Sequence, residues 1–163
     1  MSLRQHPQAD AAPGGYTGRA FGLRVDSQRP LAGFRPSTAD GRTGGPATRV
    51  ALLSGAEIDA VWQADAELVY APPTGDGGIP FTVERTANHY RFWLEGFGRY
   101  VVSADGTFVG CERGGATPAQ HERFVVAQAL PVAAVLQGFE VLHASAVRSG
   151  AGAAAFAGPS GAG

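Results

Sequence analysis

Residues 141–163 read VLHASAVRSGAGAAAFAGPSGAG, and this stretch determines the expected fold class of the chain. An apolar run at residues 141–147 is followed by turn-forming residues at 148–152. A second apolar run covers residues 153–157 and leads directly into GPSGAG at residues 158–163. The pattern predicts a strand, a turn, a second strand and a glycine-rich loop.

The glycine-rich loop matches the first six positions of the phosphate-binding motif G-x-x-x-x-G-K-[ST]. Glycines let such a loop fold tightly, so that backbone N–H groups converge on phosphate oxygens. The expected phosphate-binding residues are Gly158, Pro159, Ser160, Gly161, Ala162 and Gly163. The lysine and the hydroxyl residue of the motif contact the β- and γ-phosphates and Mg²⁺, and they would be the two residues after Gly163. We therefore expect the 163 residues alone to have little or no affinity for nucleotide.

Other interpretations of the glycine-rich stretch remain open. A stretch rich in glycine and alanine at a chain end is often flexible and without a ligand. Some dinucleotide-binding domains also begin with a strand followed by closely spaced glycines. The nucleophile motif G-x-S-x-G of serine hydrolases is disfavoured, because Ala162 stands where its second glycine should be.

The combination of LHASAV at residues 142–147, a glycine turn, a short apolar strand and GPSGAG resembles HPr kinase/phosphorylase C-terminal-like proteins. His143 lies fifteen residues before Gly158, which is the spacing of the family's strand histidine from its loop. The resemblance covers residues 141–163 and is looser over the helical stretch before them. It implies that His143 lies near the phosphate site and tunes its charge. The alternative is a strand histidine hydrogen-bonded to the backbone.

The resemblance implies a kinase that uses ATP and Mg²⁺ to phosphorylate a hydroxyl group, on a protein serine or on a small molecule. The family's catalytic aspartate follows the phosphate loop and has no counterpart in these residues. We therefore expect an inactive N-terminal fragment of such a phosphotransferase, whose parent protein binds the nucleotide. The alternatives are a non-catalytic β-rich module that recognises a partner, and the start of a dinucleotide-binding domain.

The composition favours a globular protein of the cytoplasm. Hydrophobic residues make up 44% of the chain, which is enough to form a core. The 13 basic and 14 acidic residues give a net charge of −1 without a basic patch, so nucleic acids and membrane surfaces are poor partners. The single cysteine, Cys111, excludes an intrachain disulfide and has no C-x-x-C partner for a metal site. No apolar segment reaches the roughly 20 residues of a membrane-spanning helix.

The hydrophobic pattern divides the chain into four parts and predicts an α+β fold. Residues 1–18 are expected to be a flexible leader, and residues 19–116 a β-rich N-terminal domain. Residues 117–138 are expected to form a helical connector. Residues 139–163 are expected to begin an incomplete P-loop α/β kinase-like domain.

The clearest prediction in the β-rich part is an antiparallel meander over residues 90–111, with a turn at Asp105 and Gly106. Its aromatic side chains are expected to form core and cross-strand contacts rather than a platform on which a ligand stacks. These are Tyr90, Phe92, Trp93, Phe97 and Tyr100. Shorter strands are expected at residues 20–25, 49–53, 66–70 and 79–85. Pro80 places the last of these at a sheet edge, and residues 56–63 fit a helix or a strand.

Thr117, Pro118 and Gln120 predict the start of a helix, because together they supply a cap, a first-turn proline and a capping box. The following residues are apolar on most sides, so the helix should lie between layers, against the N-terminal sheet and the strand pair that follows. Pro131 should kink this helix or start a second one that ends at Gly138. His121 and Glu122 are expected to be exposed.

Overall fold

The computed structural model describes residues 15–31, 34, 46–62, 65–72, 80–142, 144–150 and 152–158. Its main element is an eight-stranded sheet in the order β1-β2-β3-β8-β7-β6-β5-β4, and a separate two-stranded sheet pairs β10 with β9. The strands are β1 (Tyr16–Ala20), β2 (Leu23–Ser27), β3 (Ala47–Leu52), β4 (Glu67–Tyr70), β5 (Phe81–Arg85), β6 (His89–Leu94), β7 (Gly98–Ser103), β8 (Phe108–Arg113), β9 (Ser145–Ser149) and β10 (Gly152–Phe156). The described residues therefore have the predicted α+β fold.

The large sheet is mixed. Strands β4 to β8 form an antiparallel meander, and β1 pairs antiparallel with β2. Strand β3 joins these two halves, because it runs parallel to β2 on one side and to β8 on the other. The meander predicted over residues 90–111 is confirmed as β6, β7 and β8.

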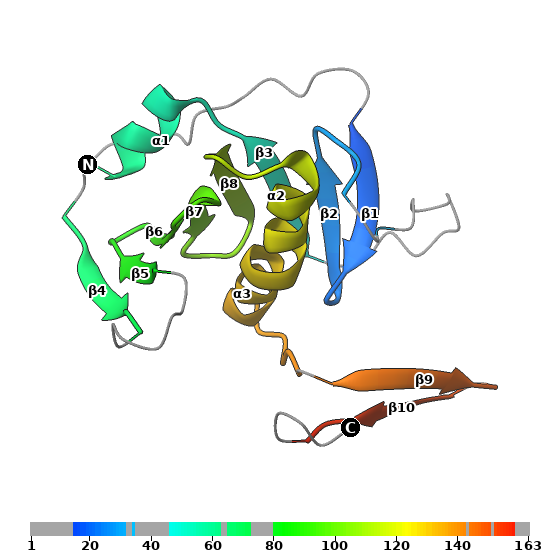
Figure 1. Ribbon diagram of the computed structural model, residues 1–163. Helices are drawn as coiled ribbons and strands as arrows, with labels where there is room; N and C mark the ends of the chain where they lie inside the picture. Colours follow the sequence, from blue (N-terminus) through cyan, green and yellow to red (C-terminus); the bar gives the residue numbers. More distant parts are fainter. Residues whose placement is uncertain are drawn as a thin grey trace.

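Helices cover both faces of this sheet. On one face, α2 (Pro118–Phe124), a π-helical turn η1 (Val125–Ala129) and α3 (Leu130–Leu136) form one column, shown in yellow and gold in Figure 1. On the other face lies the short helix α1 (Gly55–Trp62). Alternation along β7 separates two buried clusters, because Tyr100 and Val102 pack with the helical column while Val101 packs with Ile58 of α1.

The helical column begins as its sequence predicts, and a second helical segment begins next to Pro131. The Thr117 hydroxyl accepts a hydrogen bond from the Gln120 backbone N–H, and the Gln120 side chain accepts one from the Thr117 backbone N–H, which completes the capping box. Pro131 cannot donate a backbone hydrogen bond. The turn before it is π-helical, with the Leu130 N–H donating to the Val125 carbonyl, and α3 begins at Leu130. The column packs on the large sheet as predicted.

The strand predicted over residues 20–25 is wrong. Ala20 ends β1 and Leu23 begins β2, and Phe21 and Gly22 between them form the hairpin turn with φ values of 51° and 81°. Phe21 is unusual at positive φ, so the sequence carried no ordinary turn signal there. Strand β1 begins at Tyr16, inside the stretch expected to be a flexible leader, while residues 1–14 lie outside the described part of the chain.

The strand predicted over residues 79–85 is present as β5, but its predicted position at a sheet edge is wrong. Pro80 immediately precedes β5, and its carbonyl accepts a hydrogen bond from the Glu95 N–H without a return bond, because proline has no N–H. Strand β5 lies between β4 and β6, and β4 forms the edge of the sheet. Residues 56–63, which fitted a helix or a strand, lie mostly in helix α1.

Candidate functional site

The predicted strand pair near the end of the chain is present as the hairpin of β9 and β10. Its register places Ser145 opposite Phe156 and Gly152 opposite Ser149. In Figure 1 this hairpin, drawn in orange and red, extends away from the large sheet and its helices. Val147 and Phe156 are 58% and 64% exposed. The helical column was also expected to pack on this strand pair, yet every residue of β10 is exposed.

Of the residues predicted to bind phosphate, the structure describes Gly158. It is exposed and follows Phe156, the last residue of β10, after one intervening residue. His143, Pro159, Ser160, Gly161, Ala162 and Gly163 lie outside the described residues. Strand β9 begins at Ser145, so the expected strand over residues 141–147 starts later than its apolar run indicated. Across the described segments, no three His, Cys, Asp or Glu side chains are grouped to hold a metal ion.

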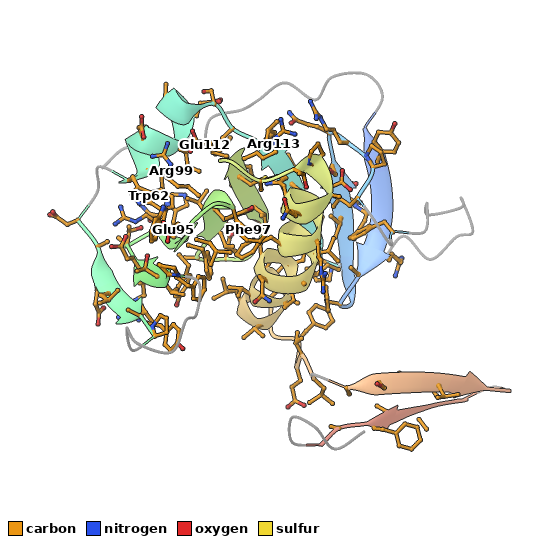
Figure 2. All side chains as sticks on the ribbon, viewed as in Figure 1. Trp62, Glu95, Phe97, Arg99, Glu112 and Arg113 are labelled. Atoms are coloured by element: carbon orange, nitrogen blue, oxygen red, sulfur yellow. The ribbon has the colours of Figure 1, made fainter. Side chains whose placement is uncertain are left out.

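A second candidate site is a groove between the meander and the helical column, with a volume of about 470 Å³. Phe81, Leu94, Phe97 and Phe124 supply its apolar lining, and we call it the aromatic groove. The rings of Phe97 and Phe124 lie 6.1 Å apart, and Phe97 is labelled beside the column in Figure 2. This volume is within the range of pockets that hold small ligands or a few side chains.

Three polar side chains border the aromatic groove. Gln120 and Arg123 come from α2, and Gln128 comes from η1. Arg123 is exposed and makes no ion pair or hydrogen bond with any residue that the structure describes. π-Helical turns occur often at functional sites, and here the turn supplies two residues of the groove wall, Ala127 and Gln128. The groove thus combines an apolar floor with one available cation.

His121 is buried, which corrects the expectation that it is exposed. It is 9% exposed, its ring stacks on Tyr100, and its Nδ1 lies 3.1 Å from the Tyr100 hydroxyl oxygen. Burial lowers the pKa of His121, and the positive charges of Arg113 and Arg29 lower it further. His121, Phe124 and Val125 have the i, i+3, i+4 spacing of one buried helix face, and this spacing was the available signal.

A cluster around Trp62 fixes α1 on the sheet. The guanidinium groups of Arg91 and Arg99 lie 5.2 and 5.7 Å from the centre of the Trp62 ring. Arg91 donates to Glu84 at 2.5 Å and to the Trp62 carbonyl at 2.7 Å, and Arg99 donates to Glu112 at 2.6 Å. Figure 2 shows Trp62, Arg99 and Glu112 together on the α1 side of the sheet. Since these cations are paired, the cluster has a structural role.

The meander aromatics are mainly structural as well. Phe92 and Tyr100 lie in the main buried cluster, as predicted, while Trp93 is 39% exposed. No helix in the described segments is both long and apolar enough to cross a membrane. Comparisons with protein-family models, curated proteins and solved structures found no match.

Proposed function

We propose that these residues are the N-terminal part of an ATP-dependent, HPr kinase-like phosphotransferase that acts on a hydroxyl group in the cytoplasm. The observation that carries the proposal is the hairpin of β9 and β10, whose second strand leads into Gly158. A strand that runs directly into a glycine-rich loop is the arrangement that P-loop proteins use for phosphate.

The exposure of the hairpin supports the same proposal. An isolated two-stranded hairpin is marginally stable in water, and this one exposes Val147 and Phe156. In the part of the chain that the structure describes, its sheet has no third strand. Further strands and helices of an α/β domain would pair the open edges and cover these side chains.

The nucleotide would bring a transferable phosphoryl group, and Mg²⁺ would neutralise the charge that develops on it. The 163 residues provide at most the first part of the phosphate loop, because its lysine and its Mg²⁺-binding hydroxyl are not among them. We therefore assign no catalytic step to these residues. His143 remains the proposed neighbour of the phosphate site.

The first test reads the coding sequence beyond the codon for Gly163. We expect a lysine and then a serine or threonine, followed by an apolar helix. The extended chain should then bind ATP in a Mg²⁺-dependent manner in calorimetric titration, and the 163-residue chain should show little binding. A stop codon, or a residue other than lysine after Gly163, would remove the basis of the proposal.

The aromatic groove favours a second candidate function, a module that recognises a protein partner without catalysis. Its apolar lining and Arg123 suit a peptide segment with an aromatic side chain next to an acidic one. The ring would lie on Phe97 and Phe124, and the carboxylate would pair with Arg123.

Matched variants distinguish this candidate from the kinase. Pull-down from a library of immobilised peptides should select aromatic-acidic segments, and Arg123→Gln should weaken their binding. Arg19→Gln, on the exposed face of β1, is the control. Retention of all sequences alike, or equal binding by both arginine variants, would exclude the recognition module and leave the nucleotide test unaffected.

A further inference from the structure

A separate cavity lies between the end of β2, the end of β8 and the first turns of α2. Its volume is about 50 Å³, and Arg29, Arg113 and His121 line it. We call it the arginine pocket. Arg113, the last residue of β8, is labelled in Figure 2 next to the start of α2. The pocket is distinct from the aromatic groove, since the two have no lining residue in common.

The cations of this pocket are available to a ligand. Neither Arg29 nor Arg113 makes a side-chain hydrogen bond or an ion pair with any residue that the structure describes. This contrasts with Arg91 and Arg99, whose guanidinium groups are paired with carboxylates. Gln28 accepts a hydrogen bond from the Leu52 N–H through its Oε1, which leaves its amide N–H groups as further donors at the rim.

His121 also lines the pocket. Its Nδ1 lies 3.1 Å from the Tyr100 hydroxyl oxygen, its Nε2 has no partner among the described residues, and the residue as a whole is 9% exposed. No buried side-chain nitrogen or oxygen of the described residues lacks a partner, so this Nε2 is accessible to solvent and can bind a ligand in the cavity. The Tyr100 hydroxyl also donates to the Phe97 carbonyl oxygen at 3.3 Å, and His121 Nδ1–H then donates to the hydroxyl. When the imidazole is protonated, both ring nitrogens are donors, so the Nε2–H group is available to an anion.

The floor of the pocket is apolar. Val50, Cys111 and Val125 are each at most 4% exposed and line it from two strands and the helical column. Burial raises the pKa of the Cys111 thiol to about 12, so the floor carries no charge at neutral pH. An apolar floor beneath two arginines suits an anion with a short hydrocarbon body better than a fully hydrated inorganic anion.

We propose that the arginine pocket binds a carboxylate with a short apolar body, whose oxygens contact Arg29, Arg113 and the Nε2 of His121. The hydrocarbon part lies on Val50, Cys111 and Val125. Among the described residues that line the pocket, Glu122 is the one with an acidic side chain, and it opposes binding. The two guanidinium groups outnumber it, so the local charge favours an anion.

Binding should change the protonation of His121 in a defined direction. The charged or titratable groups around His121 are Tyr100 on β7, Cys111 and Arg113 on β8, Arg29 after β2 and Glu122 on its own helix. Burial, Arg113 and Arg29 lower the pKa of His121 in the empty pocket. A bound carboxylate offsets both arginines and favours the imidazolium, so it should raise this pKa, and affinity should rise as pH falls.

The test titrates the 163-residue chain with butyrate and follows the His121 ring signals by NMR. We expect saturable shifts, a raised His121 pKa, and no response to butyramide, which has the same shape and no charge. Arg29→Gln and Arg113→Gln should each weaken binding by about ten-fold, since charge-assisted hydrogen bonds are lost. Both side chains are exposed, so folding should be unaffected. Glu122→Gln should strengthen binding, and Arg19→Gln should leave it unchanged.

Two further ligands complete the design. Tighter binding of acetyl-alanyl-valine than of butyrate would identify a peptide terminus as the source of the carboxylate, and the reverse order would identify a free acid. Either result supports the pocket. Equal responses to butyrate and butyramide, equal affinities in the pocket variants and Arg19→Gln, or tighter binding of inorganic phosphate would overturn the proposal.

Discussion

At the scale of single residues, the buried pair of Tyr100 and His121 links the sheet to the helical column. Tyr100 is fully buried, its ring centre lies 4.2 Å from that of Phe124, and its hydroxyl oxygen lies 3.1 Å from Nδ1 of His121. The same histidine lines the arginine pocket. One side chain therefore connects the packing of the core with the proposed binding of an anion.

Tyr100→Phe should lower the free energy of unfolding by about 1–3 kcal/mol, because it leaves His121 Nδ1 without its partner while keeping the ring. Urea denaturation followed by tryptophan fluorescence measures the change. Tyr16→Phe is the matched control, since Tyr16 is 50% exposed on β1 and should change stability by less than about 0.5 kcal/mol. Equal effects of the two variants would show that the hydroxyl contributes nothing to stability.

His121 should also make stability depend on pH. Its pKa is lowered in the folded state, first by burial and then by Arg113 and Arg29. Above its ordinary value of 6.5, histidine is neutral in both states and has no effect. Below 6.5 the unfolded chain binds a proton that the folded chain does not. The free energy of unfolding therefore decreases as the pH is lowered, by at most about 1.4 kcal/mol per pH unit. The loss levels off once pH is below the folded pKa.

The measurement compares urea midpoints above and below pH 6.5 for the unchanged chain and for His121→Gln. The variant should be less stable throughout, and its stability should fall less steeply with pH. Parallel profiles for the two proteins would contradict a lowered His121 pKa. The same profile in the presence of butyrate should be flatter than without it, which links this prediction to the arginine pocket.

At the scale of elements, the turn between β6 and β7 depends on two glycines for different reasons. Both have positive φ, 77° at Gly96 and 119° at Gly98. A Cβ atom at Gly96 would meet nothing within 4 Å, whereas one at Gly98 would lie 2.2 Å from the Glu112 carbonyl oxygen. Gly98 is therefore required by its position beside β8 as well as by its backbone conformation.

Gly96→Ala should cost about 1 kcal/mol of unfolding free energy, from backbone strain alone. Gly98→Ala should cost roughly 3 kcal/mol or more, because the clash with β8 adds to the strain. Thermal unfolding of the two variants side by side measures the difference. Equal melting temperatures would mean that β7 and β8 can separate at this end without cost.

Comparing individual strands and turns shows which parts of the fold the sequence could predict. The meander was predictable, because its apolar alternation and the Asp105-Gly106 turn agree with each other. The turn at Phe21 and Gly22 was not, since a phenylalanine at positive φ follows no turn pattern. A Cβ atom at Gly22 would lie 2.5 Å from the Phe139 ring, so a tertiary contact beyond α3 requires glycine there. Local patterns cannot show such contacts.

The candidate sites also differ in whether the sequence predicts them. The glycine-rich stretch was visible as a motif, because its residues are consecutive. The arginine pocket was not, since Arg29 follows β2, Arg113 ends β8 and His121 lies in α2. The parallel pairing of β3 with both β2 and β8 brings the first two of these places near each other. The order of strands in a mixed sheet depends on which edges pair, and hydrophobic alternation does not encode it.

At the scale of the whole molecule, the described residues divide into a well-covered part and a poorly covered part. The large sheet has helices on both faces, and the two buried clusters are formed by residues of the sheet and of these helices. The hairpin of β9 and β10 leaves Val147 and Phe156 largely exposed. An open hairpin with apolar side chains offers free backbone groups to a second chain. The same property that supports a larger α/β domain therefore predicts association when that domain is absent.

The 163-residue chain should accordingly self-associate through this hairpin, with an average mass in sedimentation that rises with concentration. Val147→Thr with Phe156→Thr should reduce the association, because both changes keep β propensity and remove exposed apolar area. The melting temperature of the large sheet should remain unchanged, since neither side chain belongs to its buried clusters.

Leu68→Thr, on the exposed edge strand β4, is the control for apolar edges in general. An average mass that stays at the monomer value at every concentration would show that the exposed hairpin does not associate. It would also remove one support for the proposed kinase-like domain. Association abolished by Leu68→Thr and not by the hairpin changes would place the contact on β4 instead.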